Sequence, residues 1–305
     1  MTFVLARTGE KSIWLMADTR LTASSGASFH DDGVKLLALD VPEGPCLIGY
    51  AGLGSTSAGT QPSEWMARVL TGVNLTLEQS IDTIARAMTE QFPQHSGATP
   101  NRAIVNHQVV AVAFSEKRAR RFIIRLVPNQ IGDGSAFRWT EILSSEDQPF
   151  LATGSFRAIP LEVGSEFSFL RGWAEEELKR IEGLVKEAEE GRLPYHEVAK
   201  EFARLNYRIH SEDDTVGPKC TVIYRYRDGG GSHVAFDGME PGGSGAMESM
   251  SHGMNMGKIC EILLEHMSPI MSEMMRTGDN APIFPEAEVN RKLAKLPSTP
   301  DEEFK

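Results

Sequence analysis

Short apolar runs separated by turn residues mark the first fifty positions. Apolar residues dominate 2–7, 12–19, 34–40 and 46–50, while turn residues occupy 8–11 and 41–45 and a Ser/Gly-rich loop occupies 23–33. Runs of this length with turns between them predict strands of one antiparallel meander. Because the runs are apolar on both faces, we expect the sheet to be covered on both sides.

Helical spacing of apolar residues begins after residue 60. One helix carries Trp65, Met66 and Val69, and a second begins at Thr76, with Gln79 completing a capping box. Further strands are predicted at 109–114, 121–127, 138–143, 150–153, 220–225 and 233–236. Between these strands, two amphipathic helices carry apolar residues from Leu170 to Val185 and from Val198 to Ile209. This order predicts an α+β fold in which two antiparallel sheets lie between helical layers, a four-layer αββα sandwich.

The composition changes after residue 236. We interpret 1–236 as one domain, 237–250 as a Gly-rich linker, and 251–305 as a Met-rich helix with an extended tail. Pro269 should kink or break that helix. The methionines near His252 admit a soft-metal interpretation, since thioethers suit Cu(I). Packing of an adaptable apolar surface on a neighbouring subunit or partner is the favoured interpretation.

Charge and cysteine content narrow the class of protein. The net charge of −11 over 305 residues argues against nucleic-acid binding, which needs a basic surface. No stretch is apolar enough to span a membrane, and the N-terminus lacks the pattern of a secretory signal. Three widely spaced cysteines do not form a disulfide framework or zinc motif, so we expect a cytoplasmic protein without metal or cofactor.

The N-terminal residues suggest a nucleophile. Removal of Met1 would leave Thr2 with a hydroxyl and a free α-amine, and an amine of pKa near ~8 can take a hydroxyl proton at neutral pH. A nearby lysine would keep that amine neutral, and a carboxylate would hold the lysine. Asp18 ends the second predicted strand, Lys35 opens the third, and Gly52 follows the fourth, where its N–H could face a developing oxyanion.

These residues resemble a motif of the proteasome β-subunit family, including its bacterial HslV-type and Anbu-type relatives. The matching positions are Thr2, Ala17-Asp18-Thr19-Arg20, Lys35 and Ala51-Gly52, and the sixteen-residue step from Thr2 to Asp18 is the family's own. The resemblance implies an N-terminal nucleophile (Ntn) hydrolase fold. It also implies Thr2 as nucleophile and base, Lys35 as the group that lowers the amine pKa, Asp18 as its orienter and Gly52 as oxyanion donor.

The match downstream is looser. Gly154-Ser155 resembles the family's Gly-Ser turn, which implies a hydrogen bond from Ser155 near the terminal amine, although Phe156 stands where the family prefers Gly. Asp213 or Asp214 resembles the Asp that supports this serine. Val216 stands where the family has a second serine, which leaves the amine network incomplete.

Three functions follow from these observations. The first is a threonine peptidase that acts on peptide or protein substrates in a ring or spiral homo-oligomer, fed by an ATP-driven unfoldase. The second is an amidase for a small or modified peptide. The third is a non-catalytic scaffold that uses the C-terminal helix as a connector. Thr2, Asp18 and Lys35 favour the enzymes, whereas Val216 favours the scaffold.

Overall fold

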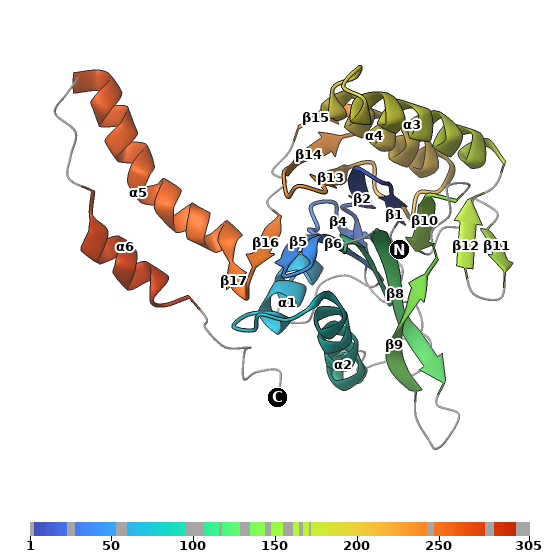
Figure 1. Cartoon of the computed structure of the whole chain (residues 1–305), viewed down its shortest axis with the longest axis horizontal. Helices are drawn as coiled ribbons and strands as arrows, with labels where there is room; N and C mark the ends of the chain where they lie inside the picture. The colour runs from blue at the N-terminus through green and yellow to red at the C-terminus, as the bar shows by residue number, and fades with distance from the viewer. Residues whose placement is uncertain are drawn as a thin grey trace.

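The chain folds as an α+β protein built on two main β-sheets (Figure 1). A computed structural model describes residues 3–22, 28–52, 60–95, 107–115, 118–128, 135–143, 148–154, 161–164, 167–170, 172–242, 247–277 and 284–296. Six helices lie within these residues. Two of the predicted site residues, Thr2 and Ser155, lie outside these ranges.

The first sheet has six strands in the order β10-β1-β2-β13-β14-β15, all antiparallel. Their bounds are β1 Phe3–Thr8, β2 Ser12–Asp18, β10 Phe150–Gly154, β13 Cys220–Tyr226, β14 Gly231–Asp237 and β15 Glu240–Pro241. The predicted hairpin of the first two strands is confirmed, with Val4 opposite Ala17. Asp18 therefore returns to the level at which β1 begins.

The second sheet has seven strands in the order β17-β16-β5-β6-β7-β8-β9. Their bounds are β5 Leu36–Val41, β6 Gly44–Ala51, β7 Gln108–Phe114, β8 Ala119–Pro128, β9 Ser135–Ile142, β16 Glu248–Ser251 and β17 Met254–Asn255. All neighbours are antiparallel except β16, which lies parallel to β5. A segment from the far end of the sequence thus pairs with an early strand.

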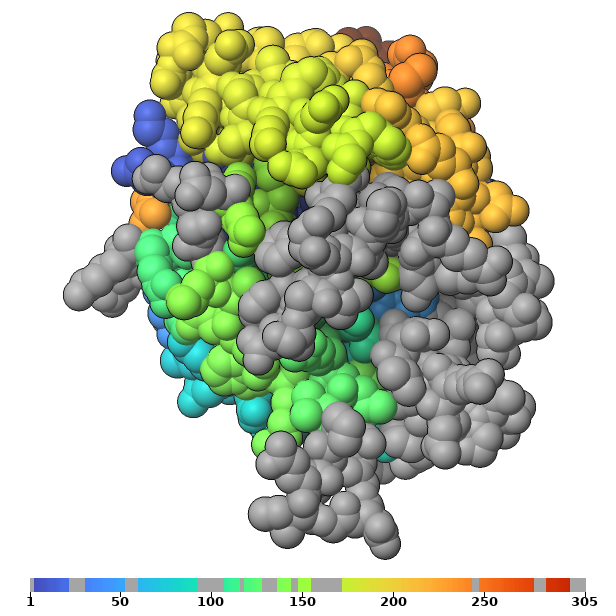
Figure 2. All heavy atoms as spheres, turned by 90° about the vertical axis from the view of Figure 1, so that its right-hand side faces the viewer, coloured from blue at the N-terminus to red at the C-terminus, as the bar shows by residue number. Residues whose placement is uncertain are grey.

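Three hydrophobic cores hold these elements together. Helices α3 (Trp173–Glu189) and α4 (Tyr195–Glu212) cover the outer face of the six-stranded sheet, where Trp14 stacks against Phe202. In Figure 2 the yellow atoms of α3 form the top of the molecule, above the green atoms from the middle of the chain. Helices α1 (Pro62–Val69) and α2 (Leu77–His95) cover the seven-stranded sheet. The two sheets face each other across a third core that contains Leu15 and Leu47. Every residue of β1 and β2 is buried, so the expected cover on both faces is confirmed.

The predicted meander is wrong. Strand β2 pairs with β13, and β5 belongs to the other sheet. The connection from Thr19 to Lys35 is far longer than a hairpin turn, so it can carry the chain between the sheets. Two small sheets also went unpredicted: β3 (Leu21–Thr22) with β4 (Ser28–His30), and β11 (Leu161–Gly164) with β12 (Phe167–Leu170). Leu170, assigned to a helix from its spacing, ends β12.

The C-terminal segment differs from its prediction in three ways. The last residues of the expected linker, 248–250, form β16 together with Ser251, and Met250 is buried in the core under α1 and α2. Helix α5 (Met256–Thr277) continues through Pro269 rather than breaking there. The expected extended tail contains helix α6 (Glu286–Leu293), which is tied to α5 by an ion pair of 2.8 Å between Lys292 and Glu265. Figure 1 shows α5 reaching away from the two sheets.

Candidate functional site

Asp18 is a fully buried carboxylate that receives four nitrogen donors. Its Oδ1 accepts hydrogen bonds from the Phe3 backbone N–H at 2.8 Å and from Lys35 Nζ at 3.1 Å. Its Oδ2 accepts the N–H groups of Arg20 at 3.1 Å and Gly217 at 3.0 Å. Burying a charge is costly unless its oxygens are paired, and here both oxygens are. Three of the four donors come from the first fifty residues, and the fourth, Gly217, lies 199 positions away from Asp18.

Lys35 lies immediately before β5 and is 2% exposed. Besides the ion pair with Asp18, its ammonium donates to the Arg20 carbonyl. Burial lowers the pKa of Lys35 below its ordinary value, and the Asp18 carboxylate offsets part of that effect. A lysine with a lowered pKa beside a carboxylate is suited to moving or repelling a proton in this site.

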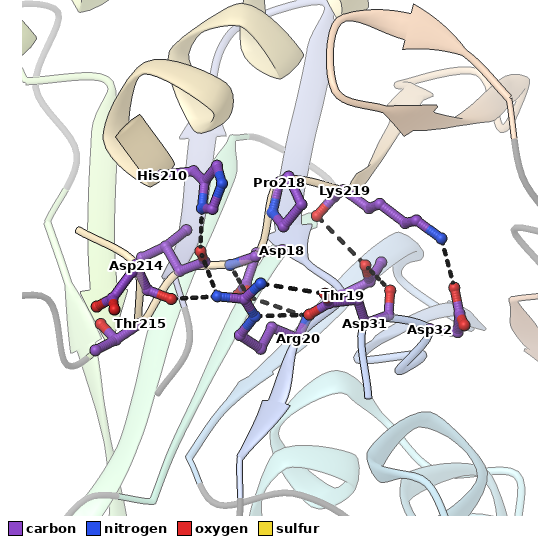
Figure 3. A network of polar contacts seen from close by, with 12 residues as sticks. Asp18, Thr19, Arg20, Asp31, Asp32, His210, Asp214, Thr215, Pro218 and Lys219 are labelled. Atoms are coloured by element: carbon purple, nitrogen blue, oxygen red, sulfur yellow. Dashed lines mark hydrogen bonds and ion pairs between the residues drawn. The ribbon is translucent and has the colours of Figure 1, made fainter. Parts of the chain in front are cut away.

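Arg20 connects three loops around Asp18 (Figure 3). Its guanidinium contacts both carboxylate oxygens of Asp31, with Nε 2.6 Å from Oδ1, and the hydrogen bond from Arg20 lowers the pKa of Asp31. The same guanidinium donates to the carbonyls of Asp214 and Val216. A bidentate arginine of this kind fixes orientation as well as charge. The loops that precede β5 and β13 are therefore held against the end of β2.

The loop between α4 and β13 contains Asp213, which was predicted to support Ser155. Asp213 is 5% exposed, and its Oδ1 accepts the N–H of Thr215 at 3.0 Å and the Thr215 hydroxyl. This is a local turn in which the aspartate bonds to the residue two positions ahead. Val216 is fully buried in the core under the helices, so it supplies packing in place of a hydroxyl.

Gly52 directly follows β6 and lies next to a buried Tyr50–His107 pair. The Tyr50 hydroxyl is hydrogen-bonded to His107 Nδ1, and burial lowers the pKa of His107 to about 4. A Cβ added at Gly52 would come within 2.8 Å of both His107 Nδ1 and the Tyr50 oxygen. Only glycine fits this approach without displacing that pair.

The structure brings together only part of the predicted set. Among the described residues, Asp18 and Lys35 are in contact, and Asp213 bonds to Thr215 in its own loop. The sequence did not indicate four residues of this site, because none of them matches a position of the motif: Gly217, Asp31, His107 and His210. The sequence Val216-Gly217-Pro218 just before a strand was a signal for a tight approach of backbone.

Neither a metal-binding cluster nor a membrane-spanning helix is found in the part of the chain that the structure describes. Among the described residues, no three His, Cys, Asp or Glu side chains gather closely enough to hold a metal ion. No described helix is long and apolar enough to cross a membrane. Cys46 and Cys220 are buried thiols, and burial raises the pKa of both, while Cys260 is exposed on α5.

Comparison with known proteins gives only distant similarity. No family model and no curated protein matches the chain. Among solved structures, the chain is similar to "Anbu (Gly-1) mutant" from Hyphomicrobium sp. strain MC1, with 15% identity over 77% of this chain and 87% of that one, and a TM-score of 0.46. It is also similar to "Anbu (ancestral beta-subunit)" from Yersinia bercovieri, with 13% identity over 79% and 84% of the two chains, and a TM-score of 0.45.

Proposed function

We propose that the chain is an N-terminal nucleophile hydrolase that cleaves peptide or amide bonds, with Thr2 as the nucleophile. The observation that carries this proposal is the buried Lys35–Asp18 pair, in contact with the backbone N–H of Phe3. Phe3 follows Thr2 directly in the sequence. In this proposal the three cores belong to the four-layer αββα sandwich of that fold.

The chemistry needs a neutral amine beside a hydroxyl. The proton of the Thr2 hydroxyl passes to the α-amine of the same residue, and the oxygen attacks the substrate carbonyl to form a C–O bond. Lys35, held by Asp18, keeps that amine neutral through like-charge repulsion. The Gly52 N–H stabilises the oxyanion. The C–N bond then breaks, the leaving amine takes the proton, and water hydrolyses the resulting ester.

The other residues complete the proposal. Ser155 is assigned to hydrogen bonding near the terminal amine, and Asp213 to supporting it through the loop that it shares with Thr215. Residues 1–236 form the hydrolase domain, with peptide or protein as substrate and an ATP-driven unfoldase as partner. The cysteine pattern supports a cytoplasmic location.

We also propose assembly into a homo-oligomer through α5. Large apolar side chains on this helix are exposed, Met271 at 52% and Met275 at 81%. Exposed apolar residues that recur along one helix are typical of an interface. An amidase that acts on small peptides uses the same site and differs only in substrate.

One observation favours the scaffold as a second candidate. Val216 is buried and carries no hydroxyl, so the amine network of an active enzyme would lack one member. A scaffold needs the fold and α5 but no turnover. The two candidates therefore differ in whether Thr2 reacts.

The test combines mass spectrometry with one substitution. Intact mass should show that Met1 is absent, since a retained Met1 would block the amine. Thr2→Ala should lower amide turnover by roughly a thousandfold or more, because it removes the reacting oxygen. Thr2→Ser is the matched control and should keep measurable turnover. Equal turnover in wild type and Thr2→Ala would reject the hydrolase and leave the scaffold.

A further inference from the structure

Two side chains of α4 reach the loop that supplies one of the donors to Asp18. Asn206 and His210 are four residues apart, so they lie on the same face of the helix. Asn206 is fully buried, and His210 is part of the network in Figure 3. Neither residue belongs to the motif from which the hydrolase was inferred.

His210 bonds to the peptide group that bonds to Asp18. Its Nδ1 lies 2.8 Å from the Val216 carbonyl oxygen. A carbonyl only accepts, so Nδ1 carries the proton and donates. The Val216 carbonyl and the Gly217 N–H belong to one planar peptide group. That N–H donates to Asp18 Oδ2 at 3.0 Å. A single rigid unit thus joins the imidazole to the carboxylate.

Asn206 holds the next peptide group of the same loop. Its Nδ2 donates to the Gly217 carbonyl at 3.0 Å. On the other side of the loop, a Cβ at Gly217 would lie 2.8 Å from Arg20 Cβ and 3.3 Å from Asp18 Oδ2. The loop therefore presses closely against the end of β2, and α4 holds it there from behind.

Arg20 shares the Val216 carbonyl with His210 but at longer range. Its Nη1 lies 3.5 Å from that oxygen, at the limit of a hydrogen bond, compared with 2.8 Å for His210. Hydrogen bonds at both ends of a peptide group polarise it and strengthen each other. Loss of the shorter bond leaves the group free to turn its N–H away from Asp18.

We propose that His210 is a positioning residue: it holds the Val216–Gly217 peptide group so that its N–H fixes Asp18, and through Asp18 the catalytic Lys35. Asn206 assists by fixing the following carbonyl. This inference rests on the proposed function for its effect on turnover. The arrangement of the peptide group itself can be measured without turnover.

The kinetic test compares His210→Leu with His210→Asn. The Asn Nδ2 can take the place of Nδ1 and donate to the same carbonyl, whereas Leu cannot. His210→Leu should lower kcat by roughly ten- to a hundredfold, the effect of a misplaced catalytic group, and leave KM unchanged. His210→Asn should restore kcat to within about threefold of wild type. His196→Leu is the matched control on the same helix, since its side chain is 60% exposed.

Hydrogen exchange at the Gly217 amide gives a readout that does not depend on turnover. The Gly217 N–H should exchange roughly tenfold faster or more in His210→Leu and return to the wild-type rate in His210→Asn. If the Leu variant does not fold, His210→Gln replaces it as the disrupting variant. The Gln side chain is one methylene longer than that of Asn, so its amide lies too far out to donate to the Val216 carbonyl.

The outcomes separate the two proposals. Unchanged Gly217 exchange in His210→Leu would overturn the positioning role, and so would a loss of kcat that His210→Asn does not restore. A wild-type protein without turnover would reject the hydrolase, while the exchange rates would still decide whether His210 holds the peptide group.

Discussion

Asp18 shows how a buried charge can be accommodated in a small space. Two backbone donors and one lysine come from residues near it in the first fifty, and the fourth donor, Gly217, comes from 199 positions later. Removing one partner of a buried pair costs about 3–5 kcal/mol, because the other charge remains buried. The site therefore resists substitution at Asp18 or Lys35 for reasons of stability as well as chemistry.

Gly52 should not tolerate even a methyl group. Gly52→Ala places a Cβ 2.8 Å from His107 Nδ1, so the backbone or the Tyr50–His107 pair must move, at a cost of about 1–3 kcal/mol. The same movement misplaces the proposed oxyanion donor, and amide turnover should fall by roughly a hundredfold or more. Urea unfolding and steady-state kinetics measure the two effects.

Gly183→Ala is the matched control for this substitution. Gly183 lies in α3 with open space around an added Cβ, and alanine favours a helix over glycine by about 1 kcal/mol. Gly183→Ala should therefore be neutral or stabilising. A Gly52→Ala protein with wild-type stability and turnover would contradict the close packing described for this glycine.

His107 makes stability depend on pH. Burial lowers the pKa of His107 to about 4, from an ordinary value of 6.5. Between these two pH values the imidazole binds a proton in the unfolded chain but not in the folded one. The neutral imidazole therefore contributes full stability above about pH 6.5, and this contribution is lost as the pH falls. Between pH 7 and pH 5 the loss should be about 2 kcal/mol.

Urea unfolding at both pH values tests this with two variants. His107→Asn keeps a polar group near Tyr50 but cannot titrate, so its stability should fall less between pH 7 and pH 5 than that of wild type. His196→Asn, on the exposed start of α4, should follow wild type. Parallel curves for wild type and His107→Asn would refute the buried neutral imidazole.

Only the site residues that belong to the motif could be predicted from the sequence. Asp18 and Lys35 were placed together by assuming one meander, and they are in contact although that meander is wrong. The facing of the two sheets brings Lys35 to the end of β2 instead. The contact of Gly217 with Asp18, and with it the place of His210, could not be predicted, because a pairing between residues about 200 apart leaves no local pattern that names the partner.

At the scale of elements, local signals were reliable and pairing was not. The capping box at α2 is confirmed by reciprocal bonds between Thr76 and Gln79 of 3.0 and 3.4 Å. Strands buried on both faces carry no alternation, so their sequence says nothing about which neighbour they have. Strand β16 escaped prediction because it is short and follows a Gly-rich segment.

Strand β16 determines how far the chain can be truncated without a loss of stability. It lies parallel to β5, with Met250 opposite Leu39 and fully buried. A chain of residues 1–246 loses this strand and should be less stable than the full chain by about 3 kcal/mol or more, the cost of emptying one buried methionine site. A chain of residues 1–255 keeps the strand and should match the full chain. Urea unfolding of the two truncations decides, and equal stability would mean that β16 is dispensable.

At the scale of the molecule, α5 is an amphipathic helix that lacks a buried face of its own. None of the described side chains of α5 is buried, although α6 packs along the helix. A helix of this kind needs a further partner to bury its apolar stripe. By contrast, the two sheets and the helices α1 to α4, which form the body of the molecule, bury their apolar side chains in the three cores.

Charges on α5 should therefore reduce assembly without unfolding the body. Met271→Glu combined with Met275→Glu changes two side chains that are 52% and 81% exposed, so the mass in solution should fall toward that of one chain. Met239→Glu is the control, because Met239 is 48% exposed on the turn between β14 and β15. Light scattering measures the mass, and an unchanged mass in the double variant would exclude α5 as the interface.

The pairing of β2 with β13 also determines when, during synthesis, the contacts around Asp18 can be completed. The ribosome releases Asp18 early, but the Gly217 N–H emerges only when about two thirds of the chain has been made. Until then the carboxylate lacks a donor and β2 lacks a neighbour. The proposed site is therefore complete only after most of the chain has been synthesised, and until then the proposed nucleophile lacks part of its supporting contacts.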